Sequence, residues 1–442
     1  MVDAEVVVVG AGAAGLSLAW RLVTGTPGAG SGAGARSAAG RTPDVLLIEP
    51  PSGPVRSPAR TWCFWEEGPG EFDDLVTASW TRLSVTDGDG RSTSGTCGAT
   101  YKMIRSGDYT RRLEACLAES DRVRRVTGTA GEAYDVPGGA EVAAVDAGGR
   151  PFRVRGRWVF DSRPPRRLPP ARTTLLQHFR GWFLRTGRPR FDASAAELMD
   201  FRTGQPHRGL AFVYLLPLAA DEALVEYTVF SSSLLPADAY DGALRRYVEE
   251  TRGLGSCEVT AAEQGVIPMT DGDFPRRAGR SVLRIGAAGG ATRPSTGYTF
   301  AAIQRQTAAV AASLRAGRTP VPPDPHSRRH RAMDAVLLRA LAEGRVDGAG
   351  FFTDLFRRNS LDTVVRFLDG RSTAAEEWAI GLRTPVVPML RTLAGLPFVP
   401  RRPGQPTAVM PGPPEDTSPA GPGVPPGEAE HAARSDPGEA RR

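Results

Sequence analysis

An unbroken apolar run lies near the start of the chain, where Val6 to Val9 are β-branched residues in succession. Such a run is typical of a strand that is buried on both faces of a parallel sheet. Leu16 to Val23 has the composition of a helix, and a second apolar run, Val45 to Ile48, ends at Glu49. The pattern predicts a β-α-β unit over residues 1–50.

Short apolar runs between turn residues fill the middle of the chain, and helical spacing returns near the end. Residues 73–96 and 122–157 predict short strands, whereas residues 106–120 have apolar positions at helical spacing. Strand-like runs dominate from about residue 172 to 270. Residues 299–395 predict helices, so the chain mixes α and β structure throughout.

Glycines follow the first apolar run as Gly10, Gly12 and Gly15, with Ala13 and Ala14 between them. In this G-x-G-x-x-G motif the first glycine permits a tight turn, the second lets backbone approach a pyrophosphate, and the third lets the helix pack close to the strand. The N–H groups that open the next helix point at the phosphates. The motif therefore predicts a dinucleotide site.

An acidic residue at the end of the second strand completes this fingerprint. Glu49 is placed to bind the ribose hydroxyl pair. It lies further past Gly15 than the usual spacing of about 20 residues. The excess falls in residues 26–43, a Gly/Ala/Ser-rich stretch that we interpret as a flexible insertion.

A second glycine-rich segment runs from Ile285 to Phe300. Two such segments far apart in sequence predict one extended cofactor held at both ends, as FAD is. We expect this segment to contribute Gly286, Gly289, Gly290, Thr296, Gly297 and Tyr298 to cofactor binding. FAD hydroxylases usually carry Gly-Asp here, whereas this chain has Gly286-Ala287. The difference argues against a monooxygenase.

The predicted fold class is α/β: a Rossmann-type FAD-binding domain like that of flavoprotein hydroxylases, an inserted β-sheet substrate domain and a C-terminal helical region. The FAD-binding domain is predicted at 1–75, 100–165 and 275–318, the substrate domain at 76–99 and 166–274, the helical region at 319–400, and a disordered tail at 401–442. The tail is rich in Pro, Gly and Glu and has almost no large apolar residues.

The net charge and the cysteine spacing argue against some classes of function. The 442 residues carry a formal net charge of +6, but the arginines are scattered and Lys102 is the single lysine. We therefore expect no nucleic-acid partner, although a basic protein is drawn to anionic membrane surfaces. The cysteines lack C-x-x-C spacing, so no metal site is expected. No signal peptide and no apolar run of 18 residues is found, which predicts no membrane span.

Several motifs outside the glycine segments resemble bacterial lycopene cyclases, the FAD-dependent carotenoid cyclase family. The resemblance runs in order from residue 6 to about 395. The motifs are Arg60-Thr61-Trp62-Cys63-Phe64-Trp65, Phe160-Asp161-Ser162-Arg163-Pro164, Gln177-His178-Phe179-Arg180-Gly181-Trp182, Met199-Asp200-Phe201-Arg202, Phe212-Val213-Tyr214-Leu215-Leu216-Pro217, Val225-Glu226-Tyr227-Thr228-Val229-Phe230, Gly265-Val266-Ile267-Pro268-Met269 and Phe367-Leu368-Asp369, together with the Gly286 to Phe300 segment.

This resemblance implies an isomerase of the intramolecular lyase type that turns the ψ-ends of lycopene into β-ionone rings, through γ-carotene to β-carotene. It implies reduced FAD, which stabilises a cationic intermediate, with NAD(P)H as the electron source and no net redox change. Lycopene and γ-carotene would be the substrates, taken from a membrane surface. The implied location is cytoplasmic and peripherally membrane-associated, with contact to other enzymes of carotenoid synthesis.

Cyclisation needs an acid for a terminal alkene, and Glu226 is the predicted acid. It stands between apolar residues on a predicted strand, where a carboxyl that faces an apolar cavity favours its protonated form. The matching family segment carries a glutamate considered essential for cyclisation. An exposed strand carboxylate is the alternative reading of Glu226.

Asp200 and Arg202 are the other predicted catalytic residues, as an ion pair that lines the same cavity; a structural salt bridge is an equal alternative. His178 favours a structural hydrogen-bonding role over that of a base. Aromatic residues of the motifs could line a polyene tunnel and stabilise cations with their ring faces. For each one, ordinary core packing is the more frequent reason for its presence.

Residues 380–400 mix large apolar residues with Arg383 and Arg391. The segment fits either a membrane-docking surface or a buried helical subdomain. Two other functions stay open at this point. One is a flavin-dependent monooxygenase or isoprenoid reductase acting on a polyene, and the other is a non-catalytic flavin- or carotenoid-binding protein.

Overall fold

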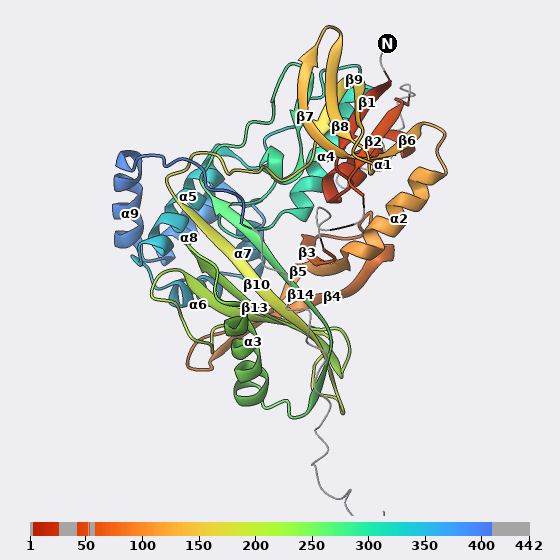
Figure 1. Ribbon diagram of the computed structural model, residues 1–442. Coiled ribbons are helices and arrows are strands. Elements are labelled where there is room, and N and C mark those ends of the chain that lie inside the picture. Colours follow the sequence, from red (N-terminus) through yellow and green to blue (C-terminus); the bar gives the residue numbers. More distant parts are fainter. Residues whose placement is uncertain (1–2, 26–41, 52, 54–57, 409–442) are drawn as a thin grey trace, which may run out of the picture. The chain divides into compact units, whose positions relative to one another are not determined.

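The computed structural model describes residues 3–25, 42–51, 53 and 58–408, and all of them belong to one compact unit (Figure 1). Two β-sheets organise this unit. The predicted insertion at 26–43 lies almost wholly outside the described residues, as does the predicted tail from residue 409 on.

The first sheet, of seven strands, contains the predicted β-α-β unit. Its order is β6-β2-β1-β9-β8-β7, with β15 added beside β9. Strands β1, β2, β6, β9 and β15 pair in parallel, whereas β7, β8 and β9 pair antiparallel. The strands are β1 (Ala4–Val9), β2 (Val45–Glu49), β6 (Val123–Thr127), β7 (Thr129–Val136), β8 (Gly139–Val145), β9 (Pro151–Asp161) and β15 (Val282–Arg284).

Strand β1 is buried on both faces, as its apolar run predicts. Val6 and Val8 pack in one core with the helices α1 (Ala13–Thr24), α2 (Ser106–Ala118) and α4 (Phe300–Arg315). Val7 and Val9 pack in a separate core on the other face. Helix α1 starts directly after β1, so the sheet and its helices fix the loop between them.

The second sheet has eight strands in the order β14-β10-β13-β12-β11-β4-β5-β3. The strands are β3 (Thr61–Glu66), β4 (Val76–Thr86), β5 (Ser92–Arg105), β10 (Thr174–Thr186), β11 (Ala195–Asp200), β12 (Leu210–Pro217), β13 (Glu222–Ser231) and β14 (Cys257–Thr270). Strand β3 pairs with β5, although the sequence assigns it to the FAD-binding domain. The pairing partner of a strand is set by tertiary contacts, which local pattern does not reveal.

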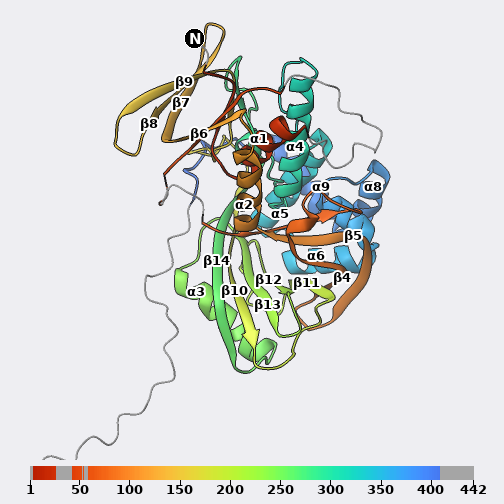
Figure 2. The same cartoon turned by 90° about the vertical axis from the view of Figure 1, so that its right-hand side faces the viewer.

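Alternate residues of the second sheet face two different layers. On β13, Val225 and Tyr227 pack against α3 (Ala237–Arg246) and the turn of π-helix after it, Tyr247–Thr251. Leu224 and Phe230 pack in the core shared with the C-terminal helices. Figure 2 shows α3 and these helices on opposite sides of the sheet.

The C-terminal helices begin at residues that cap them. The side chains of Ser327, Asp347, Ser360 and Thr373 each accept a backbone hydrogen bond from the first helical turn, as expected of such residues before a helix. The helices are α5 (Arg328–Ala342), α6 (Gly348–Arg358), α7 (Leu361–Leu368), α8 (Ala374–Arg383) and α9 (Val386–Gly395), followed by a short 3-10 helix, Leu396–Phe398. No helix in the described part of the chain could cross a bilayer.

The described chain continues beyond residue 400, where the sequence predicts the start of a tail. The backbone N–H of Arg402 donates to the carbonyl oxygen of Ala171 over 2.8 Å, and Leu168 donates to Gln405 over 2.9 Å. These backbone bonds order residues 401–408, which composition alone does not predict.

Candidate active site

The predicted dinucleotide loop joins β1 to α1. Gly10 has a φ of +98°, and a Cβ on Gly15 would lie 1.9 Å from the carbonyl oxygen of Gly10. Only glycine fits both positions. A Cβ on Gly12 would meet no atom within 4 Å, so space lies open beside the start of α1. The loop therefore has the shape that a pyrophosphate needs.

The second glycine segment lies directly against the first. A Cβ on Gly286 would stand 2.7 Å from the Cβ of Ala14, and the N–H of Gly286 donates to Gln306 over 2.9 Å. Ala13 and Ala14 therefore line the boundary between the two segments. The structure brings both predicted ends of the cofactor site together.

Glu49 lies at the end of β2 and is 6 % exposed. Arg125 donates to its Oε1 from Nε over 3.1 Å and also binds Glu114. Part of the carboxylate is thus engaged by a guanidinium. The ribose contact of Glu49 stays a prediction.

The remainder of the second segment rests on the second sheet. Gly289 and Gly290 end the 3-10 turn that follows β15, and Thr296 is buried in the loop after it. Gly297 has a φ of +70°, and a Cβ there would lie 2.2 Å from Oε1 of Gln177 on β10. That oxygen is buried and has no hydrogen-bond partner among the described residues. Because the Gln177 oxygen lacks a donor, a bound ring with an N–H group could donate a hydrogen bond to it beside Gly297.

A buried ion pair fixes this loop to the C-terminal helices. Arg293 is 1 % exposed and binds Asp334 of α5 over 3.1 Å. Ser295 donates to the same carboxylate over 2.7 Å. Helix α5 therefore positions Thr296 to Tyr298.

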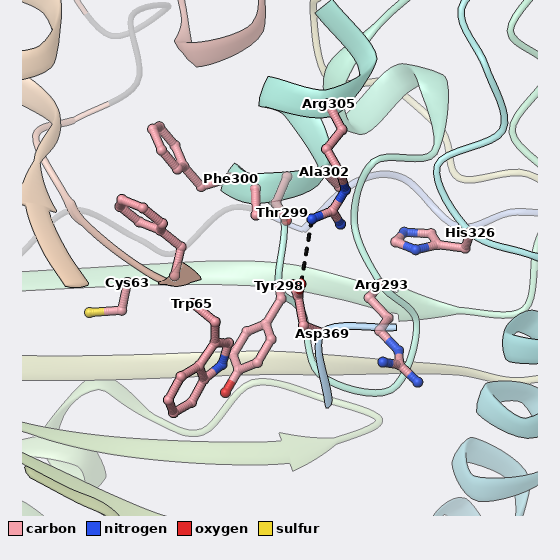
Figure 3. A pocket seen from close by; sticks show the side chains of 12 residues that line it. Cys63, Trp65, Arg293, Tyr298, Thr299, Phe300, Ala302, Arg305, His326 and Asp369 are labelled. Carbon is pink, nitrogen blue, oxygen red and sulfur yellow. Dashed lines mark hydrogen bonds and ion pairs between the residues drawn. The ribbon is translucent and has the colours of Figure 1, made fainter. Parts of the chain in front are cut away.

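A pocket with about 300 Å³ of space free of protein atoms opens between the second glycine segment and β3 (Figure 3). Tyr298 extends beside the indole of Trp65, and Arg305 forms an ion pair of 3.4 Å with Asp369. The lining residues are Cys63, Phe64, Trp65, Arg293, Tyr298, Thr299, Phe300, Ala301, Ala302, Arg305, His326 and Asp369.

Two glutamates lie on the same face of the second sheet on either side of a glycine. Gly181 of β10 is paired with Glu226 of β13 on one side and with Glu263 of β14 on the other. Directly opposite residues of paired strands share a face. A Cβ on Gly181 would lie 2.9 Å from Cδ1 of Leu224 and 3.4 Å from the Cβ of Glu226, so the glycine lets these two side chains pack closely over it.

The electrostatics of this pair favour a proton on Glu226. Burial among protein atoms, and next the charge of Glu263, raise the pKa of Glu226 to about 8, while the hydroxyl of Thr228 opposes the shift. Thr228 donates to Oε1 of Glu226 over 3.0 Å. Glu226 is thus able to donate a proton near neutral pH.

The tyrosines and the cysteine beside Glu226 are neutral. Tyr214 stands opposite it on β12, and burial raises the pKa of Tyr214 well above its usual value. Burial likewise raises the pKa of Tyr298 to about 12. Burial also raises the pKa of the Cys63 thiol, to which the charges of both glutamates add. Cys63 and Tyr298 also line the pocket, which therefore adjoins the glutamate pair.

The cofactor loop and the glutamate pair share one face of β10. Gln177, which touches Gly297, and Gly181 are both on this face because side chains alternate along a strand. They are separated by roughly 13 Å at the strand rise of about 3.3 Å per residue. A cofactor at Gly297 and a proton donor at Glu226 could therefore act on one bound molecule.

The predicted pair Asp200 and Arg202 does not join this group. The two residues form an ion pair of 2.6 Å, and Tyr247 donates to Asp200 over 2.7 Å. Asp200 pairs with Val213, which packs on the α3 face. The prediction that this pair lines the Glu226 cavity fails because the residues face the opposite side of the sheet.

His178 also faces the α3 side. Its ring is fully buried between the hydroxyl groups of Tyr240, at 2.6 Å, and Ser231, at 2.8 Å. Burial lowers the pKa of His178 to about 4. These contacts are those of a structural histidine, as the sequence favours.

The predicted aromatic lining is divided among three cores. Trp65, Tyr214 and Phe230 lie in the core on the Glu226 face. Trp62 and Phe64 pack with the first sheet, and Trp182 and Tyr227 pack on the α3 face. Sequence reasoning did not single out Glu263 or the orphan oxygen of Gln177, although Gly181 and Gln177 lie in one motif and Glu263 lies two residues before another.

Solved structures with this fold are flavoproteins of the hydroxylase-like class. A geranylgeranyl bacteriochlorophyll reductase-like protein from Thermoplasma acidophilum aligns with a TM-score of 0.55 at 13 % identity, over 89 % of this chain and 99 % of that one. A flavoprotein/dehydrogenase from Cytophaga hutchinsonii aligns with a TM-score of 0.53 at 11 % identity, over 89 % and 99 %. At such identities the likeness concerns the fold.

The family model described as lycopene cyclase protein matches residues 5–394. A lycopene beta-cyclase from Pseudescherichia vulneris is 27 % identical over 405 residues, which cover 87 % of this chain and 95 % of that protein. The chain belongs to the lycopene cyclase family. Its class of activity is accordingly the cyclisation of lycopene.

Proposed function

We propose that this protein is a lycopene beta-cyclase that forms β-ionone rings at the ψ-ends of lycopene, giving γ-carotene and then β-carotene. The observation that carries the proposal is Glu226, a carboxyl with a pKa of about 8 on the sheet face that also meets the second glycine segment. The mechanism is acid catalysis without net redox change.

Glu226 starts the reaction by donating its proton to a terminal alkene. The neutral side chains of Tyr214, Tyr298 and Cys63 surround the donor and exclude water, which would otherwise capture a carbocation. The ring faces of Trp65 and Tyr214 stabilise positive charge through their quadrupoles. Ring closure then follows by attack of the neighbouring alkene.

The cofactor of the proposed enzyme is FAD in its reduced form, with NAD(P)H as the electron source. When bound, reduced FAD supplies negative charge close to the cation. Its pyrophosphate would be held by Gly10, Gly12 and Gly15, and its ring would lie by Gly297 and Tyr298, where the orphan Gln177 oxygen accepts a hydrogen bond. The missing acid at Ala287 supports this assignment over a hydroxylase.

The test is anaerobic incubation with lycopene in liposomes, FAD and NADPH, followed by chromatography of the pigments. Wild-type protein is expected to give β-carotene of unchanged mass. Glu226→Gln is expected to lower the rate by about 10² to 10⁴-fold, the range for loss of a general acid. Glu222→Gln is the matched control, because Glu222 is on the same strand but binds Arg185 at its outer end.

A flavin-dependent monooxygenase or isoprenoid reductase is the alternative. Such an enzyme would consume one nicotinamide per product and give oxygenated or hydrogenated pigment. Either product would refute the cyclase proposal. Conversion by Glu226→Gln at the wild-type rate would refute the role of Glu226 alone.

The membrane surface is the proposed source of lycopene, and the C-terminal helices carry a surface that fits it. Large apolar side chains are exposed there, with Trp378 and Phe398 at 73 % and 86 %. We call this the docking surface; it consists of Trp378, Leu382, Val386, Val387, Leu390, Leu393 and Phe398. Val386, Val387, Leu390 and Leu393 lie on one side of α9 at helical spacing.

The charge around the docking surface selects an anionic bilayer as its partner. Arg383, Arg391, Arg401 and Arg402 are exposed beside it, and the sequence has no acidic residue from Trp378 to Pro414. Apolar side chains that enter the lipid and arginines that meet lipid phosphates are the features of a monotopic contact. The location that follows is cytoplasmic and peripheral.

Flotation with vesicles tests this contact. Wild-type protein is expected to float with vesicles of phosphatidylcholine and phosphatidylglycerol, and Val387→Glu with Leu390→Glu is expected to abolish flotation while conversion of detergent-dispersed lycopene persists. Val259→Glu is the control, since Val259 is exposed at 41 % on β14 outside the surface. A bilayer partner would be contradicted if wild-type protein does not float with the vesicles. It would also be contradicted if wild-type protein is a dimer that the double substitution converts to a monomer.

A further inference from the structure

Glu263 is a second buried carboxyl that the proposed acid step does not use. It is 9 % exposed, lies on β14 opposite Gly181 and is on the same face of the sheet as Glu226. The two strands that carry the glutamates are separated by β10 alone. Adjacent strands are about 4.8 Å apart, so the two backbones are roughly 10 Å apart.

Burial raises the pKa of both glutamates, but more groups favour the charged form of Glu263 than that of Glu226. Thr61 donates from its hydroxyl to Oε2 of Glu263 over 2.8 Å. Burial raises the pKa of Glu263, but Thr61 and the positive charges of Arg105 and Arg60 oppose that shift. No cation opposes the shift of Glu226. When the environments of two carboxyls differ in this way, one serves as acid and the other as base.

We propose that Glu263 is the base that removes the ring proton after cyclisation. This inference rests on the proposed function. The geometry that carries it is the placement of both carboxyls on one sheet face, on the two strands that flank Gly181. A polyene end that lies over Gly181 meets the acid on one side and the base on the other.

The proton balance closes without an oxidant. The proton of Glu226 forms a new C–H bond at the terminal alkene, whose electrons make that bond and leave a tertiary cation. The next alkene forms the ring C–C bond and moves the positive charge to a ring carbon. Glu263 takes the proton from the adjacent ring carbon, and the electrons of that C–H bond become the ring double bond.

After each ring closes, Glu263 holds a proton and Glu226 does not. A proton that returns from Glu263 to Glu226 along this face of the sheet restores the starting state. The position of Glu263 also selects which carbon loses its proton. It therefore decides between a β-ring and other double-bond positions.

The test compares Glu263→Gln with wild type in the liposome assay. The rate is expected to fall about 10² to 10⁴-fold, and the residual product is expected to include rings with a displaced double bond or a hydroxyl group from water. Glu226→Gln, by contrast, leaves lycopene unchanged. Glu197→Gln is the matched control, since Glu197 is equally buried but faces α3 and binds Arg252 over 3.0 Å.

A pH profile separates a base from a structural residue. Wild-type activity is expected to fall at low pH as Glu263 becomes protonated, and above about pH 8 as Glu226 loses its proton. The charged or titratable groups that face Glu263 are Arg60, Arg105, Cys63 and Glu226. Thr61→Val removes a donor to the carboxylate, so the low-pH limit is expected to move upward.

The outcomes divide cleanly. If wild type forms no rings, the proposed function itself is wrong. If wild type forms rings and Glu263→Gln keeps its rate, ring type and low-pH limit, the base assignment is wrong. If Glu263→Gln does not fold, an unchanged low-pH limit in Thr61→Val refutes the assignment.

Discussion

Glu226 is stabilised in its neutral form, and this has a cost at high pH. Its pKa is about 8 in the folded protein against 4.5 for an ordinary glutamate. A group whose pKa is raised by folding contributes stability below its unfolded pKa, and that contribution is lost as the pH rises through the folded value. The fold therefore loses stability progressively as the pH rises from about 4.5 to 8, and the loss persists above pH 8.

Glu226→Gln is expected to remove this pH dependence. The variant should be more stable than wild type at pH 8 and nearly equal to it at pH 4.5, because glutamine stays neutral throughout. Thermal unfolding at both pH values measures the difference. A variant that is less stable than wild type at pH 8 would show that Glu226 carries its charge without penalty.

Single residues of the site differ in how well sequence reveals them. Glu226 was found because a carboxyl amid apolar strand residues is visible locally. Glu263 was not found, because its position relative to Glu226 depends on the register of three strands, β10, β13 and β14. These strands are separated in the sequence. Asp200 was assigned to the wrong face since the β11 register shifts between Glu197 and Asp200.

At the scale of elements, the loop from Gly286 to Thr299 connects the two halves of the site. It leaves the first sheet after β15, touches β10 at Gly297 and is tied to α5 through Arg293 and Asp334. Its conformation thus depends on a helix that contributes no residue to the glutamate pair.

Asp334→Asn is expected to destabilise the protein by about 3 to 5 kcal/mol, because it leaves the Arg293 charge buried without its partner. It should also weaken flavin binding, since the loop loses its attachment. Asp354→Asn is the control. Asp354 of α6 is 28 % exposed and pairs with two arginines, so its loss is expected to cost about 0.5 kcal/mol. Equal denaturation midpoints for the two variants would contradict the role of the Arg293 pair.

The elements that sequence predicts well are those with local signals. Strand β1, helix α1 and strand β2 follow directly from apolar runs and glycine spacing. Strand β3 was predicted in the FAD-binding domain, and its pairing with β5 in the eight-stranded sheet is set by tertiary contacts that the local pattern does not reveal. Residues 401–408 pair with the loop before β10, a contact that composition does not encode.

In the molecule as a whole, the described chain forms one unit with two sheets, and the predicted cofactor site spans both. The first glycine loop belongs to the seven-stranded sheet, whereas Gly297 rests on the eight-stranded one. The α/β class and the flavoprotein fold were predicted from the two glycine segments, and the solved structures confirm them. The exposure of α9 was not decided by sequence, because an apolar helix fits a core as well as a membrane.

FAD is expected to stabilise the whole unit more than ADP does, because ADP lacks the ring that the second segment would contact. At a ligand concentration 100 times its Kd, bound ligand stabilises by about 2.7 kcal/mol. At matched multiples of Kd the two ligands would stabilise the protein equally, whatever their affinities. Melting curves are therefore recorded with both ligands at the same concentration. The same melting temperature with either ligand would mean that Gly297 and Tyr298 contribute nothing to binding.

The two faces of β13 also restrict where the chain can accept insertions and deletions. Glu226 lies on the same face as Glu263 and its neighbours Val225 and Tyr227 face α3, and a shift of one residue exchanges the two sets. An insertion or deletion of one codon within the strand would place Glu226 under α3 and a tyrosine on the face of Glu263. Natural or engineered homologues are therefore expected to differ in length at the turn of this hairpin, or by an even number of residues within the strand.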